Sequence, residues 1–445
     1  MEFRFKSFVS PRYLWSKSQS RRLCLVSVLY FGILGNHSLI LAQAPSSSVV
    51  SPDQKTIQVL LERIEKLEAR VAQLEASENP PAPAAPGPAP AEQPVSTPAS
   101  ETPMSERMDV SETLLRIRGF GDVNFHGDTQ KGSPSSFTLG QLNLFVTSDI
   151  SEKFKFLGEI VFEGGPDNIF GITRGSRNSF GVDIERFLLQ YSHNDYFNLS
   201  VGRYHTAIGY YNTAYHHSTW FQTTEGRPFL FEFEDRGGIL PIHNVGVSAS
   251  GLVPSGPLGL HYVAEVGNGR SSRSPLDEEQ VQNIVDENNH KAFNLALFAR
   301  PKAISGLQAG FSVYHDLLTP LGSPNVTETI LAAHAVFTRP RFEWLNEALV
   351  IRHAPAGISH VFQTPGFYTQ VSRRFGAYRP YFRYEYVNAS NHEPIFPDIG
   401  LRQGPSVGVR YDASESVAVK FQYDYTGLRR QPAINSLGLQ VGFTF

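Results

Sequence analysis

The sequence is almost free of cysteine and lacks a long apolar run outside its N-terminus. Cys24 is the single cysteine among 445 residues, so neither disulfides nor thiol chemistry is expected to support the fold or the function. No segment after residue 44 is apolar enough to form a transmembrane helix. There is also no basic run beyond the extreme N-terminus, and the formal net charge is only -3. Nucleic acid is therefore not an expected partner.

Residues 1–44 have the composition of an export signal. Basic residues precede the apolar run "LCLVSVLYFGILG" (residues 23–35), and the following "LAQA" places Ala42 and Ala44 in the small-residue pattern of a signal-peptidase site. The pattern predicts a signal peptide cleaved after Ala44. A single membrane anchor is the alternative, but the run is shorter than the roughly 20 apolar residues that a span needs.

A polar segment, residues 45–55, leads into a heptad pattern over residues 56–76. Ile and Val occupy the a positions and Leu the d positions, with Arg at g and Glu at e. A single solvated helix is the alternative, because about three heptads alone are marginally stable. The residues predicted to associate in this coiled coil are Ile57, Leu60, Ile64, Leu67, Val71, Leu74, Arg63, Glu68, Arg70 and Glu75.

The number of chains in the coiled coil is open between two and three. β-Branched residues at a with Leu at d favour two strands. However, "RIEKLE" and "RVAQLE" resemble the short signature of trimeric coiled coils, and Leu61 widens the apolar stripe, so we favour three. Residues 77–111 are rich in Pro and Ala, which cannot pack a core and predict a semi-rigid linker.

From residue 112 to 445 apolar and polar residues alternate. In "SVAVKFQYDYT", Val417, Phe421 and Tyr423 lie on the face opposite Lys420 and Asp424. One face carries charges in strand after strand, so the apolar face must be the covered one. About sixteen such segments are predicted, at residues 117–126, 139–148, 153–163, 182–192, 197–206, 244–253, 258–267, 291–300, 306–315, 328–338, 341–352, 362–373, 378–387, 405–412, 417–425 and 435–445.

Short turns and long polar loops alternate between these segments. An outer-membrane barrel sorts its connections in this way, with short periplasmic turns and longer external loops. The sequence therefore predicts an all-β fold, a transmembrane antiparallel β-barrel of about 16 strands preceded by a short coiled-coil helix and a Pro-rich linker. Closure would leave no open strand edge in lipid. A secreted soluble β-protein is the alternative.

The final stretch "LQVGFTF" is an alternating strand that places an aromatic residue, Phe445, last. This pattern resembles the C-terminal signal read by the outer-membrane barrel-assembly machinery, which is an expected partner together with outer-membrane lipid. The expected localisation is the cell outer membrane, with the coiled coil in the periplasm, where peptidoglycan is a candidate contact.

The longest loop, residues 207–243, is the third external loop in this arrangement. Its aromatic residues, Tyr210, Tyr211, Tyr215, Trp220 and Phe221, would be oddly exposed if the loop stayed in water. We therefore predict that the loop enters the lumen as a constriction. The other constriction candidates in it are His216, His217, Arg227, Glu234, Asp235 and Arg236.

The run "VGRYHTAIG" and the size and turn order of the barrel resemble the phosphate-selective porins O and P. The resemblance covers the barrel region and implies a trimeric, sixteen-stranded diffusion pore. Phosphate selectivity in that family relies on clustered Lys and Arg at the constriction. This loop has Arg227 and Arg236 but no Lys, against four acidic residues, so we do not extend the phosphate preference to this chain.

Charged residues on the faces opposite the lipid-facing sets are predicted to line the pore, because a lipid-facing Arg or Lys near the midplane costs about 2 to 4 kcal/mol. Mixed signs suit small hydrophilic solutes with weak ion preference; alternatively, many of these charges pair and fill the lumen. Strict alternation aims Arg203 and His205 at lipid unless a bulge lies near Gly202 or they lie beyond the apolar band. The candidates are Arg118, Asp122, Lys155, Glu159, Arg186, Arg383, Glu385, Arg410, Lys420 and Asp424.

The sequence predicts a porin that passes small hydrophilic solutes or ions and needs no cofactor. His205, His216 and His217 do not have the spacing of a metal motif, and no Ser, His and acid are spaced as a hydrolase triad, so we expect no metal site and no enzyme. The alternative from another class is an adhesion or tethering protein that acts through its coiled coil, with the barrel as an anchor.

Overall fold

The structure is a computed structural model that describes residues 114–166, 178–215, 220–234, 237–272 and 285–445. The predicted signal peptide, polar segment, coiled coil with its pairing residues, and linker all lie outside the described residues and stay predictions. Among the residues that are described, no helix is both long enough and apolar enough to cross a membrane.

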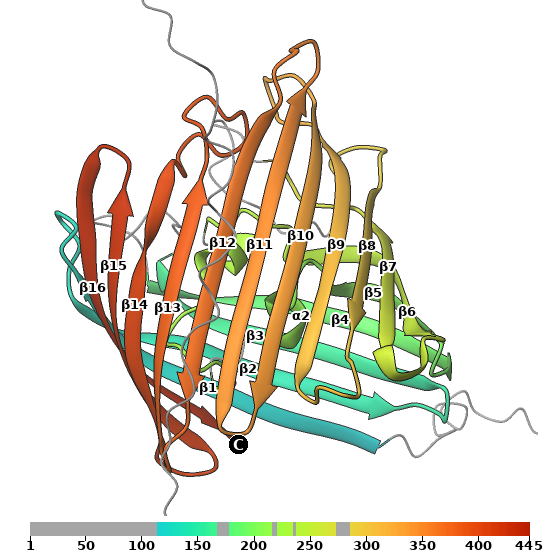
Figure 1. Cartoon of the computed structure of the whole chain (residues 1–445), viewed down its shortest axis with the longest axis horizontal. Coiled ribbons are helices and arrows are strands. Elements are labelled where there is room, and N and C mark those ends of the chain that lie inside the picture. The colour runs from blue at the N-terminus through green and yellow to red at the C-terminus, as the bar shows by residue number, and fades with distance from the viewer. Residues whose placement is uncertain (1–113, 167–177, 216–219, 235–236, 273–284) are drawn as a thin grey trace, which may run out of the picture. The chain divides into compact units, whose positions relative to one another are not determined.

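Sixteen antiparallel strands form one closed barrel (Figure 1). Each strand pairs with its neighbours in the chain, and β1 pairs with β16 from Phe120↔Thr444 to Asp128↔Ser436. The prediction of a closed antiparallel barrel of about 16 strands is confirmed. The strands are β1 (Leu114–Asp128), β2 (Ser136–Asp149), β3 (Phe154–Pro166), β4 (Asn178–Asn194), β5 (Phe197–His205), β6 (His243–Val253), β7 (Leu260–Gly267), β8 (Ala292–Ala299), β9 (Leu307–Leu318), β10 (Val326–Arg339), β11 (Phe342–Pro355), β12 (Phe362–Arg373), β13 (Tyr378–Asn388), β14 (Leu401–Asp412), β15 (Val417–Leu428) and β16 (Gln431–Thr444).

Some strands begin earlier than the alternation predicts. The segments predicted at 405–412 and 435–445 begin at Leu401 and Gln431 in the structure. Main-chain pairing continues there, for example between Leu401 and Asn388, although the side chains no longer alternate. The predicted bounds were therefore too short, because side-chain pattern reports which face is covered and not how far the hydrogen-bonded ladder runs.

The apolar side of the sheet is the outside of the barrel. On β15 the side chains of Phe421, Tyr423 and Tyr425 are exposed, whereas those of Lys420 and Gln422 are buried inside. The same division runs round the barrel, as a transmembrane barrel requires. Other large apolar side chains exposed on the outer face are Val123, Leu139, Val201, Phe293, Leu295, Phe311, Phe367 and Leu439.

The seam between β1 and β16 is closed by Phe445 and two glycines. The N–H groups of Gly119 and Phe445 each donate to the other residue's carbonyl oxygen, at 2.9 and 3.0 Å. A Cβ on Gly119 would lie 2.3 Å from the Phe445 ring, and one on Gly121 would lie 2.7 Å from the Phe443 ring. Glycine is therefore needed at both positions for the aromatic rings to cover the seam.

Two irregularities turn charged side chains into the barrel. Gly202 has a φ of 133°, a conformation that L side chains rarely adopt, and beyond it Arg203 and His205 are buried. The register of β5 with β4 and with β6 runs unbroken through Gly202, so the predicted bulge is not found there, and the unusual backbone conformation of Gly202 is the local irregularity. On β4, pairing with β3 skips Glu185, so Glu185 and Arg186 are both buried, as a β-bulge allows.

We expect Phe421→Arg to destabilise the barrel strongly. Phe421 is exposed on the outer face of β15, and a cation at the midplane of the lipid-facing surface costs about 2 to 4 kcal/mol. The measurement is the free energy of unfolding in lipid vesicles. The control is Phe375→Arg, because Phe375 is exposed in the β12–β13 turn and a cation near the interface costs about 0 to 1 kcal/mol. Equal costs at the two positions would contradict a lipid-covered outer face.

Candidate functional site

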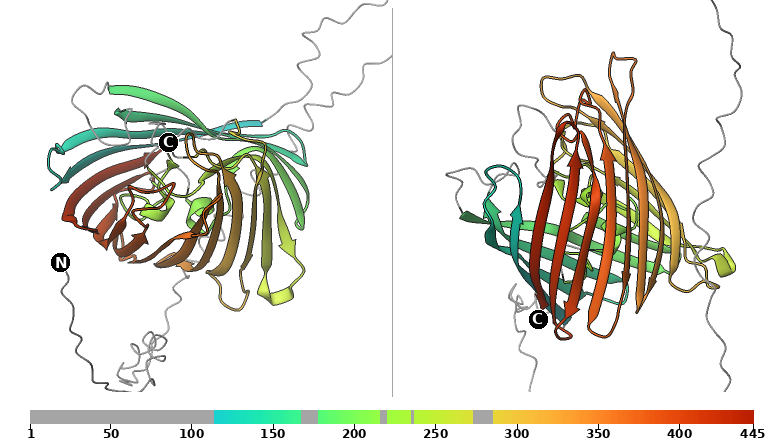
Figure 2. Two further views of the ribbon diagram at one scale, coloured as in Figure 1. Left: turned by 90° about the horizontal axis from the view of Figure 1, so that it is seen from above. Right: turned by 60° about the vertical axis from the view of Figure 1, so that its left-hand side comes forward.

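The connection between β5 and β6, residues 206–242, lies inside the barrel. We call it the inner loop. Seen along the barrel, its green segments lie within the ring of strands (Figure 2). It contains the short helix α2 (Tyr211–Ala214) and the 3-10 turn η2 (Phe229–Phe231). Its contacts reach strands far from its own ends, and they divide into an apolar cluster, carboxylate anchors and cationic anchors.

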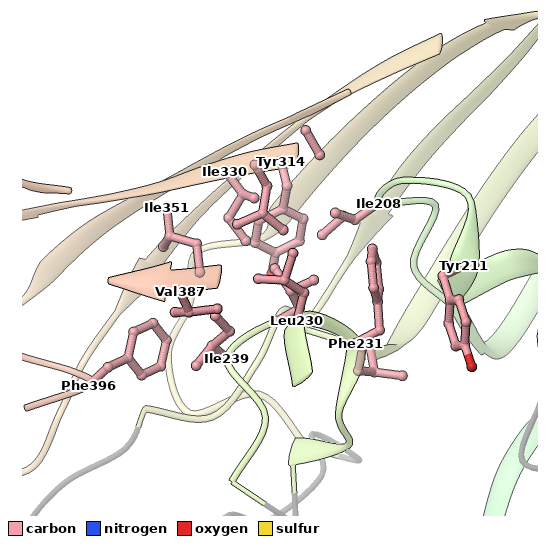
Figure 3. Close-up of a cluster of buried hydrophobic side chains, with 14 of the residues drawn as sticks. Ile208, Tyr211, Leu230, Phe231, Ile239, Tyr314, Ile330, Ile351, Val387 and Phe396 are labelled. Carbon is pink, nitrogen blue, oxygen red and sulfur yellow. The ribbon is translucent and has the colours of Figure 1, made fainter. Parts of the chain in front are cut away.

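The apolar cluster packs the inner loop against the inner wall of β9 to β13 (Figure 3). Ile208, Leu230 and Phe231 of the loop are at most 1% exposed. A barrel lumen is ordinarily polar, but this wall carries apolar side chains that the loop covers. Fully burying one such side chain contributes about 1.5 to 3 kcal/mol, so the cluster fixes the loop strongly. The wall residues include Tyr314, Ile330, Leu345, Leu349, Ile351, Tyr368 and Val387.

Carboxylates of the wall hold the first part of the inner loop. The Glu347 carboxylate accepts hydrogen bonds from the N–H groups of Tyr210, at 2.5 Å, and Tyr211, at 2.9 Å. Glu265 accepts one from the N–H of Ala207 at 3.0 Å. The N–H groups at the start of a helical turn have no partner within the turn, so these acidic side chains satisfy donors that would otherwise be buried unpaired.

Three cations hold the middle of the inner loop. Arg410 donates to the carbonyl oxygens of Trp220, at 2.6 Å, and Gln222, at 2.9 Å. The Lys420 ammonium donates to the Thr224 carbonyl at 2.9 Å, and Arg383 donates to that of Gly226 at 2.8 Å. Hydrogen bonds from charged donors are about twice as strong as neutral ones. The cations predicted to face solutes therefore bind the loop backbone.

A buried charge cluster holds the end of the inner loop. His243 lies between two glutamates: its Nε2 is 2.7 Å from Glu185 of β4, and its Nδ1 is 3.3 Å from Glu234 of the loop. Burial alone raises the pKa of Glu234, but the charge and hydrogen bonds of His243 outweigh it and hold the pKa below its ordinary value. Arg203 lies 3.6 Å from Glu185.

Some predicted candidates stabilise the loop from within or lie at its surface. The Arg227 guanidinium lies 4.1 Å from the Phe233 ring centre, and its Nε donates to the Phe231 carbonyl at 2.5 Å. The hydroxyl of Tyr215 donates to Glu343 at 2.9 Å. Trp220 packs against the buried Phe120 of β1 at 6.5 Å between ring centroids. The candidates His216, His217, Asp235 and Arg236 lie outside the described residues.

The remaining candidates are divided between the inner face and one end of the barrel. Asp122 is buried, and Glu159 is buried beside Arg186, with 2.5 Å between the paired atoms. Arg118 is exposed near the start of β1, with its guanidinium 5.5 Å from the Phe120 ring centre. Lys155 is exposed near the start of β3, 3.7 Å from Asp149. Neither Arg118 nor Lys155 contacts the inner loop through any described interaction.

Two carboxylates of the lumen, those of Asp122 and Asp424, accept hydrogen bonds from amide groups, and a third, that of Glu225, lies nearby. Asp122 accepts hydrogen bonds from the N–H of Gln141 and the side-chain amide of Asn124. Asp424 accepts from the Gln422 amide at 2.9 Å. Glu225 of the inner loop lies beside Gly438, where a Cβ would be 2.8 Å from its carboxyl carbon. Burial, and then the charge of Asp424, raise the pKa of Glu225 above its ordinary value.

Sequence reasoning missed the acidic anchors Glu185, Glu265 and Glu347. On β11 both faces are largely apolar, since Leu345 and Leu349 are buried inside while Trp344 is exposed outside, so alternation cannot show which face covers a loop. A usable signal was an acidic residue between apolar residues on one face of a strand, such as Glu347 between Leu345 and Leu349. Glu185 has no such signal, because its inward position depends on a bulge.

In the described ranges, no three His, Cys, Asp or Glu side chains gather in a way that could hold a metal ion. Several of the buried acidic and His groups, among them Glu347, Glu234 and His243, are instead bonded to each other or to the loop backbone.

The comparisons with known proteins concern the fold. No protein-family model and no curated sequence matches the chain. OmpF of Salmonella typhi, solved with daunomycin, is 11% identical with a TM-score of 0.53, over 74% of this chain and 97% of that chain. An anion-selective porin from Comamonas acidovorans is 12% identical with a TM-score of 0.50, over 75% and 100%. The trimer form of OmpT, an outer-membrane protein of Vibrio cholerae, is 13% identical with a TM-score of 0.50, over 75% and 99%.

At these identities the likeness shows the fold alone. The barrel has the fold of the outer-membrane porins, and this fold points to the outer membrane. Membership of the phosphate-selective porins O and P is not shown.

We expect Glu347→Gln to loosen the start of the inner loop. The change leaves one acceptor oxygen for donors that include the N–H groups of Tyr210 and Tyr211, and an unsatisfied buried donor costs about 1 to 3 kcal/mol. The measurement is amide hydrogen exchange over residues 207–215, which should become faster. Glu415→Gln is the control, because Glu415 is exposed in the β14–β15 turn. Unchanged exchange in the Glu347 variant would contradict the anchoring role.

Proposed function

We propose that this chain is an outer-membrane porin that allows passive diffusion of small hydrophilic solutes or ions. The observation that supports this most is an inner loop bonded across a closed barrel, because such a loop restricts the lumen. We propose a homotrimer, in line with the trimer form of the similar OmpT. A periplasmic coiled coil, assembly through Phe445 and contact with peptidoglycan belong to the same proposal.

We further propose that the pore weakly prefers cationic solutes. The charged strand residues Arg383 and Arg410, which hold the inner loop, contribute little to this preference. Arg383 lies 2.6 Å from Glu385, and Arg410 lies 2.7 Å from Asp412, so each charge is offset by its neighbour. The carboxylates of Asp122, Glu225 and Asp424 have no ion pair within the described part of the chain. Lys420 and Arg383 both act on these carboxylates. Together with Arg410 these cations are still fewer than the five carboxylates Asp122, Glu225, Glu385, Asp412 and Asp424, which leaves the lumen beside the loop negative.

Deleting residues 207–243 should enlarge the pore. The inner loop occupies part of the lumen, so its removal leaves a wider path and a larger single-channel conductance in a planar bilayer. Heat-modifiable migration on gels checks that the barrel is retained. An unchanged conductance with an intact barrel would refute the restricting role, and absence of any steady current in the parent protein would favour the tethering alternative.

The preference for cations should decline on mild acidification. Because burial raises the pKa of Glu225, this group binds a proton at a pH where an exposed carboxylate is still ionised. The negative charge of the lumen then falls. The measurement is the reversal potential under a salt gradient as a function of pH. Glu225→Gln should have a weaker preference at neutral pH and a flatter profile, whereas Glu415→Gln should match the parent; identical profiles in all three would contradict the assignment.

A further inference from the structure

The connection between β13 and β14, residues 389–400, also folds into the barrel. We call it the second loop. Ile395 and Phe396 are at most 1% exposed, and they belong to the same apolar cluster as Leu230 and Ile239 of the inner loop. Figure 3 shows Phe396 near Val387 and Ile239. The sequence gives no reason to expect this, since the predicted constriction is confined to the inner loop.

A histidine between two glutamates fixes the second loop to the wall. The Nε2 of His353, on β11, lies 2.8 Å from Glu328 of β10, and its Nδ1 contacts Glu393 of the loop. All three side chains are at most 1% exposed. A carboxylate accepts but does not donate, so hydrogen bonds to both glutamates require a hydrogen on each ring nitrogen, which is the imidazolium form.

Glu393 transmits this fixation to the apolar residues. Its second carboxylate oxygen accepts hydrogen bonds from the N–H groups of Ile395, at 2.9 Å, and of Phe396. One carboxylate therefore joins the wall histidine to the backbone of the buried loop residues. If it is released from His353, the segment that places Phe396 in the cluster loses its tie to the wall.

The same arrangement occurs at the inner loop, where His243 lies between Glu185 of the wall and Glu234 of the loop. In both places a histidine near the end of a strand joins a glutamate of the wall to a glutamate of an inward-folded loop; the wall glutamate lies on the adjacent strand β10 for His353 and two strands away, on β4, for His243. Two independent instances indicate a shared device rather than one fortuitous contact.

The surroundings of the two histidines contain further charged groups. Near His243, Arg203 lies 3.6 Å from Glu185, and the His205 ring lies 4.9 Å from that of His243. On the other side, the Arg270 guanidinium lies 4.9 Å from the Phe396 ring centre and donates to the Ile239 carbonyl at 2.7 Å. Arg270 thus joins both loops. Asp316 accepts from the N–H of Arg270 and the hydroxyl of Tyr314, and it is paired with Glu328 across β9 and β10.

We propose that the second loop is a further restricting element of the pore and that His353 is its positioning residue, acting through Glu393. The proposal rests on the proposed porin function. Loss of the imidazolium charge, by substitution or at alkaline pH, leaves Glu328 and Glu393 as two buried carboxylates without the cation between them. The loop is then released from the wall, and the lumen widens.

The test measures loop position separately from conductance. Ile395→Cys is made in a chain that also carries Cys24→Ser, so the new thiol is the single one. We call the arrangement of His353, Glu328 and Glu393 the lock. With the lock intact, the thiol should be protected from a membrane-impermeant maleimide, and it should react after His353→Gln or Glu393→Gln. The matched control is His392→Gln, because His392 is exposed in the same loop and takes no part in the lock; its thiol should stay protected.

The parent and each of these variants are also recorded in a planar bilayer. His353→Gln and Glu393→Gln should raise the single-channel conductance. Alkaline pH should raise the conductance of the parent by a larger factor than that of Glu393→Gln, because only the arrangement at His243 remains to respond in the variant. Glu393→Gln changes no strand residue, so it serves if His353→Gln fails to fold. Thiol release without a conductance change would overturn the restricting role, and a thiol equally reactive or equally protected in all variants would overturn the lock. A parent without any conductance would refute the porin function, while the thiol result would still decide the lock.

Discussion

The pairing of β1 with β16 is the contact on which the rest of the structure depends. Lipid offers no partner to an unpaired N–H or C=O group, so a sheet whose outer face is apolar must close on itself. The seam is covered by aromatic rings that fit only because Gly119 and Gly121 lack side chains. Closure in turn creates an interior, and the interior is what gives the inward-folded loops a wall to pack against.

The interior departs from a simple polar channel. One wall, β9 to β13, is apolar because the inner loop covers it, and the charged residues around that cluster bond to the loop backbone. Arg410, Lys420 and Glu347 are examples of side chains whose charge satisfies loop carbonyl or N–H groups. The groups most obvious in sequence as pore-lining charges are thus largely used to position the restriction, and fewer remain to face a solute.

The sequence was sufficient to predict the barrel but not the way its lumen is filled. Alternation identifies the covered face of β15 and the approximate place of every strand, because lipid selects apolar side chains at every second position. It cannot show that the inner face of β11 is covered as well, since Leu345, Leu349 and Ile351 then read as a strand with two apolar faces. Glu185 and Glu393 become significant only when a bulge and a folded loop bring them to a histidine. Those contacts are long-range, and no local pattern encodes them.

The spread of the inner loop's anchors has a mechanical consequence. Its backbone is tied to Glu265 on β7, Glu347 on β11 and Lys420 on β15, which lie on widely separated parts of the ring. A wide sheet cylinder held only by neighbouring strands can flatten into an ellipse at little cost. Hydrogen bonds that join the inner loop to distant strands oppose this flattening. The loop that narrows the lumen therefore also keeps the cross-section of the barrel constant.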